Sequence, residues 1–246
     1  EGNKKLSKRD PESNLLLHRE AGMIPEGLNN YLALLGWSIS PDNDVFSMEE
    51  MAAAFDISDV NPNPARFDPK KCIAINAEHI RLLEPDDFRG RIVPFLHRDG
   101  LVSADSFDEL TADEQKIMQH ASPLIQTRIQ LLGEAPGMLG FLFTEDDALE
   151  LDEKSVSKLK ENAPEVLDAT IRFIENYDGP FTTEALEHAL RELIVEGMDI
   201  KPRIAFGPIR VAVTGRQVSP PLFESMEILG RESVLNRLHS LRNRLG

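Results

Sequence analysis

Apolar side chains recur every three or four positions along most of the chain, which is the spacing of one face of an α-helix. The clearest run lies between a proline, which suits the first position of a helix, and a glycine, which suits its end. This run consists of Pro25, Leu28, Tyr31, Leu32, Leu35 and Gly36. Alternating patterns typical of strands and Asn-Gly hairpin signals are nearly absent. The pattern therefore predicts an all-α protein.

Further helix boundaries are predicted from capping residues. Ser47 with Glu50, and Thr111 with Glu114, have the spacing of a capping box, in which each side chain accepts a hydrogen bond from the other residue's backbone N–H. The remaining expected starts are Asp68-Pro69, Ser122-Pro123, Thr183, Pro208 and Ser219-Pro220, and the expected ends are Gly197, Gly215 and Gly230. A last helix is expected to be lined by Val234, Leu238 and Leu241.

The helical pattern is interrupted twice. The stretch LLEPDDF, around Glu84, brings a proline and acidic residues into a helical run. The stretch FLFTEDDALELDEKS passes from apolar to acidic near Thr144. We therefore expect three segments, at residues 1–84, 85–143 and 144–246.

The composition suits packed helices. Hydrophobic residues make up 41% of the chain and aromatic residues 6%, so a core would consist mainly of aliphatic side chains. Cys72 is the only cysteine, which excludes an intrachain disulfide, and we expect it to be buried on a helix. No apolar run approaches the length of a membrane span, about 20 residues, and no signal peptide is recognisable. We therefore expect a cytoplasmic protein with no membrane contact.

The formal net charge is −15 at pH 7. It argues against general nucleic-acid binding, and we expect no DNA partner, because phosphates would be repelled at long range. The charge is uneven, however: acidic residues dominate from Glu145 to Asp168, whereas arginines outnumber acidic residues from Lys201 onward. Any contact with nucleic acid is therefore expected to be local.

Few residues form a recognisable catalytic or metal-binding motif. The six histidines are scattered, and HExxH, CxxC and EF-hand spacings are absent, so we expect no metal site. The G-x-S-x-G, GxGxxG and Walker patterns are absent as well. The acidic pairs Asp86-Asp87 and Asp146-Asp147 are expected to be solvated in loops. Only the basic opening GNKKLSKRDP has the composition of a phosphate-binding loop.

Several segments resemble one family. KKLSKRDP resembles the KMSKR loop of class I aminoacyl-tRNA synthetases. The segments REAGMIPEGLNNYLALLGWS, FSMEEMAAAFDISDVNPNPARFDPKK and HIRLL are similar to the stem-contact region that follows this loop in bacterial glutamyl-tRNA synthetases. IRVAVTGRQVSPPLFESMEILGRE is similar to the end of the anticodon-binding body of the same enzymes. The segments occur in the family's order, which makes the combination more specific than any single motif.

The resemblance implies a helical stem-contact segment followed by a two-part α-helical anticodon-binding region. Residues 1–84 would form the KMSKR loop and stem-contact domain, 85–143 the first anticodon-binding subdomain and 144–246 the second. In the family, a Rossmann domain with a HIGH-type motif precedes the KMSKR loop, and no segment of this chain fits that role. We therefore expect the C-terminal part of such an enzyme.

The reaction implied by the resemblance is ATP-dependent activation of glutamate, followed by its transfer to the 3′ end of tRNA. In this family Lys5 and Lys8 would be the catalytic lysines, and Lys5, Ser7, Lys8 and Arg9 would contact the ATP phosphates. Cationic groups there stabilise the negative charge that builds up as pyrophosphate leaves. ATP with Mg²⁺ is expected in the parent enzyme only. Without a Rossmann domain, we expect this chain to bind no cofactor and to catalyse no aminoacylation.

Four residues are expected to read the anticodon, whose unpaired bases expose their Watson–Crick edges. By resemblance, Arg210 reads a base, because a planar guanidinium suits the acceptors of cytosine. Ser219 would act as a donor or helix cap, and Leu222 as an apolar contact. Arg128, in TRIQLLGE, is a candidate reader of the third base, which separates glutamate tRNA from glutamine tRNA, although a solvated helix arginine explains it equally well.

The remaining expectations concern partners. Lys70, Lys71 and Arg81 could contact phosphates of the tRNA stem, but a solvated face explains them equally well. The expected partner is glutamate tRNA, with glutamine tRNA left open, and a monomer is expected. Two alternatives stay open: a free-standing RNA-binding or adaptor module derived from the synthetase, and a helical protein-interaction domain that uses the acidic stretch from Glu145 to Glu165.

Overall fold

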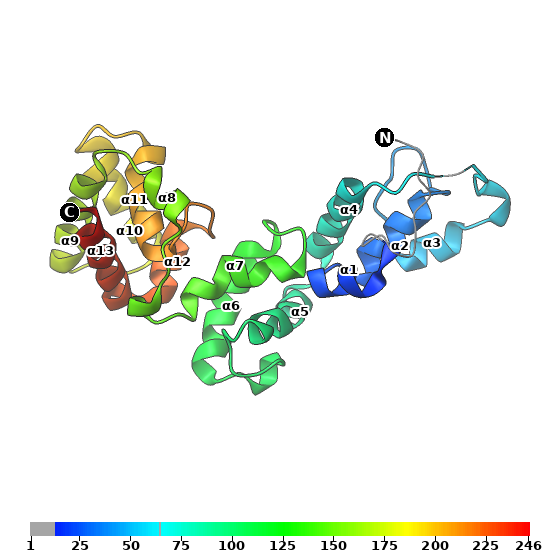
Figure 1. Cartoon of the computed structure of the whole chain (residues 1–246), viewed down its shortest axis with the longest axis horizontal. Coiled ribbons are helices and arrows are strands. Elements are labelled where there is room, and N and C mark those ends of the chain that lie inside the picture. The colour runs from blue at the N-terminus through cyan, green and yellow to red at the C-terminus, as the bar shows by residue number, and fades with distance from the viewer. Residues whose placement is uncertain (1–12, 64) are drawn as a thin grey trace. The chain divides into compact units, whose positions relative to one another are not determined.

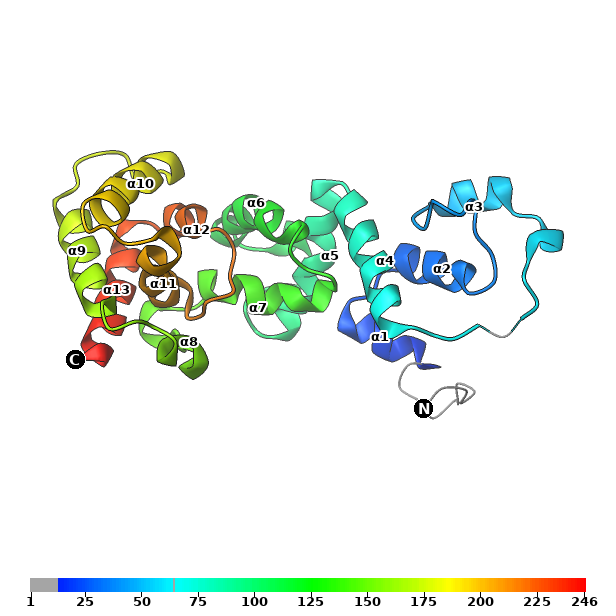
Figure 2. The ribbon, with the colours of Figure 1, turned by 90° about the horizontal axis from the view of Figure 1, so that it is seen from above.

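The computed structural model describes residues 13–63 and 65–246, which form helices joined by loops (Figures 1 and 2). None of these described residues forms a strand, and an isolated bridge between Ser40 and Asn43 is the nearest approach to one. The prediction of an all-α protein is confirmed. Among the described helices, none is long and apolar enough to cross a membrane.

The chain divides into two compact units. Unit 1 comprises the described residues up to Leu110 together with Ile125–Pro136, and unit 2 comprises Thr111–Leu124 together with Gly137–Gly246. The helices of unit 1 are α1 (Leu15–Ala21), α2 (Pro25–Leu34), α3 (Met48–Ala54), α4 (Pro69–Leu82) and α5 (Pro85–Arg98).

Unit 2 contains the first part of α6 (Ala112–Gln126) and most of the later helices. These are the last part of α7 (Ala135–Leu139), whose first two residues belong to unit 1, and the whole of α8 (Glu153–Ser157), α9 (Ala163–Asn176), α10 (Thr183–Leu190), α11 (Pro202–Thr214), α12 (Leu222–Leu229) and α13 (Arg231–Leu245). A π-helical segment, Arg191–Glu196, continues α10.

The predicted capping residues are in place at several helix starts. Ser47 and Glu50 form a complete capping box at α3. At α6, the backbone N–H of Glu114 donates to Thr111 Oγ1, and that of Thr111 donates to the Glu114 carboxylate. Asp68 caps α4 by accepting hydrogen bonds from two backbone N–H groups of its first turn. These local signals therefore determine where the helices begin.

Two predicted helix starts are wrong, because the prolines lie inside helices. Pro123 lies within α6, and Pro208 lies within α11, which begins at Pro202. Met118 and Ile125, on either side of Pro123, are both fully buried. Burial of one continuous apolar face therefore outweighs the cost of a proline in the helix interior.

The core of unit 2 lies between α9, α11 and α13 (Figure 2). The residues predicted to line the last helix are all fully buried there. Of the apolar residues that follow Thr183, Leu186, Leu190 and Ile194 are fully buried and Leu193 is partly buried. The fully buried members include Leu167, Ile174, Leu186, Leu190, Ile209, Val213, Val234, Leu238 and Leu241. Aliphatic side chains dominate this core, as the low aromatic content predicts.

In unit 1, α2 and α4 lie side by side (Figure 1) and are joined by buried polar side chains. Asn30 Oδ1, on α2, lies 2.8 Å from His79 Nε2, on α4, and also accepts from the Phe46 backbone N–H. His79 Nε2 therefore carries the proton of this contact. Burial lowers the pKa of His79, while the nearby Glu26 carboxylate opposes that shift. His79 is thus part of the hydrogen-bonded packing between α2 and α4.

Cys72 is buried on α4, as predicted, and burial raises the pKa of its thiol to about 11. The prediction for the acidic pairs is only partly right. Asp86 is 87% exposed, but it lies in the first turn of α5 and pairs with Arg89. Asp146 is not solvated as predicted: its side chain is 25% exposed and pairs with the buried Arg237.

Candidate nucleic-acid interface

The end of α11 and the start of α12 carry the residues predicted to read bases. Gly215, with a φ of +78°, ends α11, and a Cβ at this position would lie 2.6 Å from the Glu150 carbonyl oxygen. Only glycine fits this turn without strain. The chain then runs through the exposed residues 216–218 and the Pro220-Pro221 pair into α12. We call residues 215–221 the α11–α12 loop.

The structure brings Arg210 and Ser219 together. Nη1 of Arg210 donates to Ser219 Oγ at 2.8 Å and to the Pro220 carbonyl oxygen at 2.6 Å. Arg210 is half-buried, and Ser219 is 6% exposed. The N-cap of α12 is Pro221, so Ser219 is not its cap. The guanidinium therefore lies against the α11–α12 loop, within reach of a ligand at that surface.

Leu222 is placed differently. It is the first residue of α12, is 3% exposed and packs in the core of unit 2. In the structure its side chain stabilises the fold, and a contact with a base stays a prediction for this residue.

Sequence patterns did not single out the residues that hold the α11–α12 loop. The Asp152 backbone N–H donates to the Gly215 carbonyl oxygen at 2.8 Å. The Gln217 backbone N–H donates to Ser155 Oγ at 3.0 Å. Asp152 is also the N-cap of α8, accepting from the Ser155 backbone N–H. The D-x-x-S spacing is a capping signal, but only the tertiary structure shows that it also fastens this loop.

Comparison with known proteins identifies the family to which the chain belongs. Residues 87–242 match a family model described as an anticodon binding domain. The chain belongs to the anticodon-binding domain family. Residues 1–73 match a second model, described as the catalytic domain of class I tRNA synthetases (E and Q). The resemblance of both ends of the chain to class I aminoacyl-tRNA synthetases is thereby confirmed.

Similar curated proteins are glutamate–tRNA ligases. That of Bifidobacterium adolescentis is 57% identical over 246 residues, which cover 100% of this chain and 49% of the relative. That of Kocuria rhizophila is 58% identical over 245 residues, covering 100% of this chain and 47% of the relative. The chain therefore spans about half the length of the curated relatives it matches.

A solved structure shows the same fold. A glutamate tRNA ligase from Elizabethkingia meningosepticum, in complex with its amino acid, aligns with a TM-score of 0.78 at 23% sequence identity. The alignment covers 100% of this chain and 50% of that chain. The helical architecture of this anticodon-binding domain protein thus has an experimental counterpart.

Arg128 belongs to unit 1, whereas Arg210 belongs to unit 2. Arg128 lies in the turn after α6, its side chain is exposed, and its backbone N–H donates to the Ile125 carbonyl oxygen at 2.8 Å. It is therefore not a solvated residue within a helix, as one reading of the sequence had it. Its exposure leaves the guanidinium accessible to a ligand.

The basic residues predicted to touch the tRNA stem lie along α4. Lys71 Nζ pairs with Asp44 at 2.9 Å, and Arg81 Nη1 pairs with Glu78 at 2.5 Å, while Lys70 is exposed. The residues predicted to hold ATP phosphates lie outside the part of the chain that the structure describes. They are Lys5, Ser7, Lys8 and Arg9.

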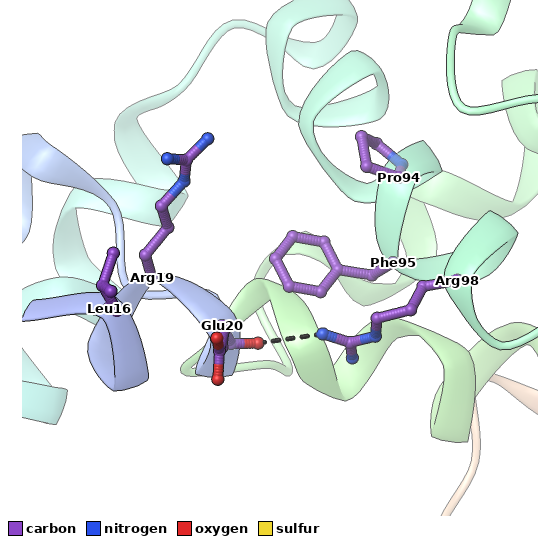
Figure 3. Close-up of a pocket in the computed structure, with 6 residues that line it drawn as sticks. All are labelled: Leu16, Arg19, Glu20, Pro94, Phe95 and Arg98. Atoms are coloured by element: carbon purple, nitrogen blue, oxygen red, sulfur yellow. Dashed lines mark hydrogen bonds between the residues drawn. The ribbon is translucent and has the colours of Figure 1, made fainter. Parts of the chain in front are cut away.

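A separate hollow lies in unit 1 between α1 and α5 (Figure 3). It has a volume of about 310 Å³ and an apolar floor that includes Leu16 and Phe95. Arg98 donates to the Glu20 carbonyl oxygen at 3.1 Å and lies 5.1 Å from the centre of the Phe95 ring. Arg19 also lines the hollow. Glu20 also lines the hollow, so its surface is apolar with both cationic and acidic groups.

Proposed function

We propose that this chain is the tRNA-binding and anticodon-reading part of a glutamate–tRNA ligase. The match of residues 87–242 to an anticodon binding domain carries the proposal, and whole-chain identity of 57% to a glutamate–tRNA ligase supports it. The parent enzyme would activate glutamate with ATP and transfer it to the 3′ end of tRNA. The proposed partner is glutamate tRNA. The protein is proposed to be a monomer and to be located in the cytoplasm.

The α11–α12 loop is the proposed site of anticodon contact. Arg210 offers a planar cation whose Nη1 is already oriented by Ser219 and by the Pro220 carbonyl oxygen. A side chain held in place before binding loses less conformational freedom when a base arrives. Unpaired bases present acceptors that a guanidinium can reach. Arg128 is proposed to read a second base, and through it to distinguish glutamate tRNA from glutamine tRNA.

The proposal assigns ATP chemistry to the parent enzyme. Lys5 and Lys8, with Ser7 and Arg9, would contact the phosphates of ATP, which the parent enzyme would bind together with Mg²⁺; the match of residues 1–73 to the class I catalytic domain model supports this assignment. Charge stabilisation without a positioned substrate gives little catalysis. The chain by itself is therefore proposed to bind tRNA without aminoacylating it. We also propose that the chain divides into three functional segments: the KMSKR loop and stem-contact domain at residues 1–84, and two anticodon-binding subdomains at residues 85–143 and 144–246.

Replacing Arg210 by alanine tests the site. The expected result is a loss of tRNA affinity of about 1–3 kcal/mol, because a base contact and a cation are removed together. Affinity would be measured by fluorescence anisotropy with labelled glutamate tRNA at constant salt. Arg203→Ala is a matched control, since Arg203 is an exposed arginine in the first turn of the same helix.

Circular dichroism would establish that Arg210→Ala retains the helical fold, because the side chain also holds the α11–α12 loop. Arg210→Lys keeps the charge without the planar fork, and we expect it to recover only part of the affinity. Equal tRNA affinity for a folded Arg210→Ala variant and the parent chain would contradict the proposed site.

A further inference from the structure

Val218 is an apolar side chain held in solvent. It is 76% exposed, more than any other large apolar side chain described in unit 2. Its neighbours Arg216 and Gln217 are exposed as well. A single exposed apolar residue is ordinary on a protein surface. Here the backbone that carries it is fastened on both sides, so its exposure is a fixed feature of the surface.

The fastening begins just after α11. Thr214 Oγ1 donates to the Arg216 carbonyl oxygen at 3.0 Å, and the Asp152 backbone N–H donates to the Gly215 carbonyl oxygen at 2.8 Å. Arg216 Nη1 donates to the Gly137 carbonyl oxygen at 3.0 Å. Residues from three separate stretches of unit 2 therefore hold this side of the loop.

A second set of contacts lies next to Val218. The Gln217 backbone N–H donates to Ser155 Oγ at 3.0 Å, and Ser155 Oγ in turn donates to Asp152 Oδ2 at 2.5 Å. Ser155 is 5% exposed, so water competes little for these bonds. On the other side of Val218, Arg210 holds Ser219. Both neighbours of Val218 are thus anchored, while its own side chain projects from the surface.

We propose that Val218 is a further base-contacting residue of this interface, with Asp152 and Ser155 as the residues that position it. This inference rests on the proposed function. The ligand is an unpaired nucleotide of the anticodon loop, whose base face is apolar enough to cover Val218. Arg210 bonds to Ser219, the next residue after the valine, and Arg216 lies two residues before it. Both cations attract a polyanion, which favours RNA over a protein partner on a chain of net charge −15. Leu222, the apolar residue indicated by the family resemblance, is already buried in the core.

The substitution Val218→Ser tests this contact. With a synthetic anticodon stem-loop RNA as the probe and the full chain as the protein, we expect affinity to fall by roughly 5- to 10-fold. The side chain is exposed, so the melting temperature should not change. Ile57→Ser is the matched control, because Ile57 is 75% exposed but lies in unit 1. It should leave the affinity unchanged.

The positioning role of Ser155 is tested by a double-mutant cycle. We expect Ser155→Ala to weaken RNA binding, and the double variant Ser155→Ala/Val218→Ser to be no weaker than the more affected single variant. A purely structural serine would lower the melting temperature and leave the affinity for the stem-loop unchanged. That outcome, or independent additive effects, would overturn the positioning role.

Failure of this inference is distinguishable from failure of the proposed function. If Val218→Ser binds the stem-loop within twofold of the parent chain while Arg210→Ala binds weakly, the valine contact is refuted and the anticodon site stands. If neither substitution changes affinity, both are refuted.

Discussion

Arg237 is 2% exposed, yet it carries a full positive charge into unit 2. Its guanidinium donates to Asp146 Oδ1 at 2.6 Å and to the carbonyl oxygens of Phe141, Thr144 and Val213. Burial alone would raise the pKa of Asp146, but hydrogen bonds from Ser233, Arg237 and Asn236 outweigh it and lower that pKa. Arg237 therefore ties α13 to the end of α11 and to the segment that precedes α8.

Arg237→Met should destabilise the chain strongly. It would leave a half-buried carboxylate and several carbonyl oxygens without their donor, and we expect a loss of about 3–5 kcal/mol in the free energy of unfolding. Urea unfolding followed by circular dichroism measures this. Arg244→Met is the control, because Arg244 and Glu153 form an exposed pair, and it should cost less than about 1 kcal/mol. Similar urea midpoints for the two variants would refute the role assigned to Arg237.

At this scale, sequence reasoning found individual residues but not their surroundings. The family resemblance placed Arg210 and Ser219 at one site, and the structure shows them hydrogen-bonded. It could not show that Leu222 is buried or that Ser155 holds the loop, since both depend on residues distant in sequence. Sequence reasoning also missed that Asp146 is paired, because its partner Arg237 lies 91 residues further along the chain.

Helices α2 and α4 approach each other closely at Gly27. A Cβ on Gly27 would lie 2.6 Å from the Asn76 Cα and 2.7 Å from its Oδ1. Asn76 is fully buried, and its Oδ1 accepts from the Ile24 backbone N–H at the start of α2. The glycine therefore permits the contact through which α4 satisfies a backbone group of α2.

Gly27→Ala should separate these two helices. We expect it to cost about 1–3 kcal/mol of unfolding free energy, because the added methyl group overlaps backbone atoms of α4. Gly90→Ala is the control: Gly90 lies inside α5 with nothing within 4 Å of an added Cβ, so it should be neutral or stabilising by up to about 1 kcal/mol. Trp37, the single tryptophan, is buried in unit 1 and its fluorescence reports this unfolding. Equal stability of the two variants would refute the close approach.

Helix existence and most capping residues could be predicted, because period and caps are local properties of the sequence. The capping boxes at Ser47 and Thr111 are examples. Boundaries marked by proline alone could not, since Pro123 and Pro208 lie on helices that continue through them. There, burial of distant apolar partners decides the outcome, and such partners are not visible in a local pattern.

Over the whole molecule, charge limits where RNA can bind. The chain carries a net charge of −15, and many of its arginines are held by other parts of the protein. Arg231, Arg237, Arg242 and Arg244, near the C-terminus, all bond to residues of unit 2. The basic character of this end therefore does not form a broad cationic face. Under the proposed function, tRNA recognition would therefore depend on a few placed contacts.

The most direct test of anticodon reading is to change the anticodon. Two transcripts of glutamate tRNA, identical except for their anticodon bases, would be titrated with the full chain at the same salt concentration. The account predicts that the transcript with the altered anticodon binds roughly 5- to 100-fold more weakly, corresponding to about 1–3 kcal/mol of lost base contacts. Equal affinity for the two transcripts would contradict it.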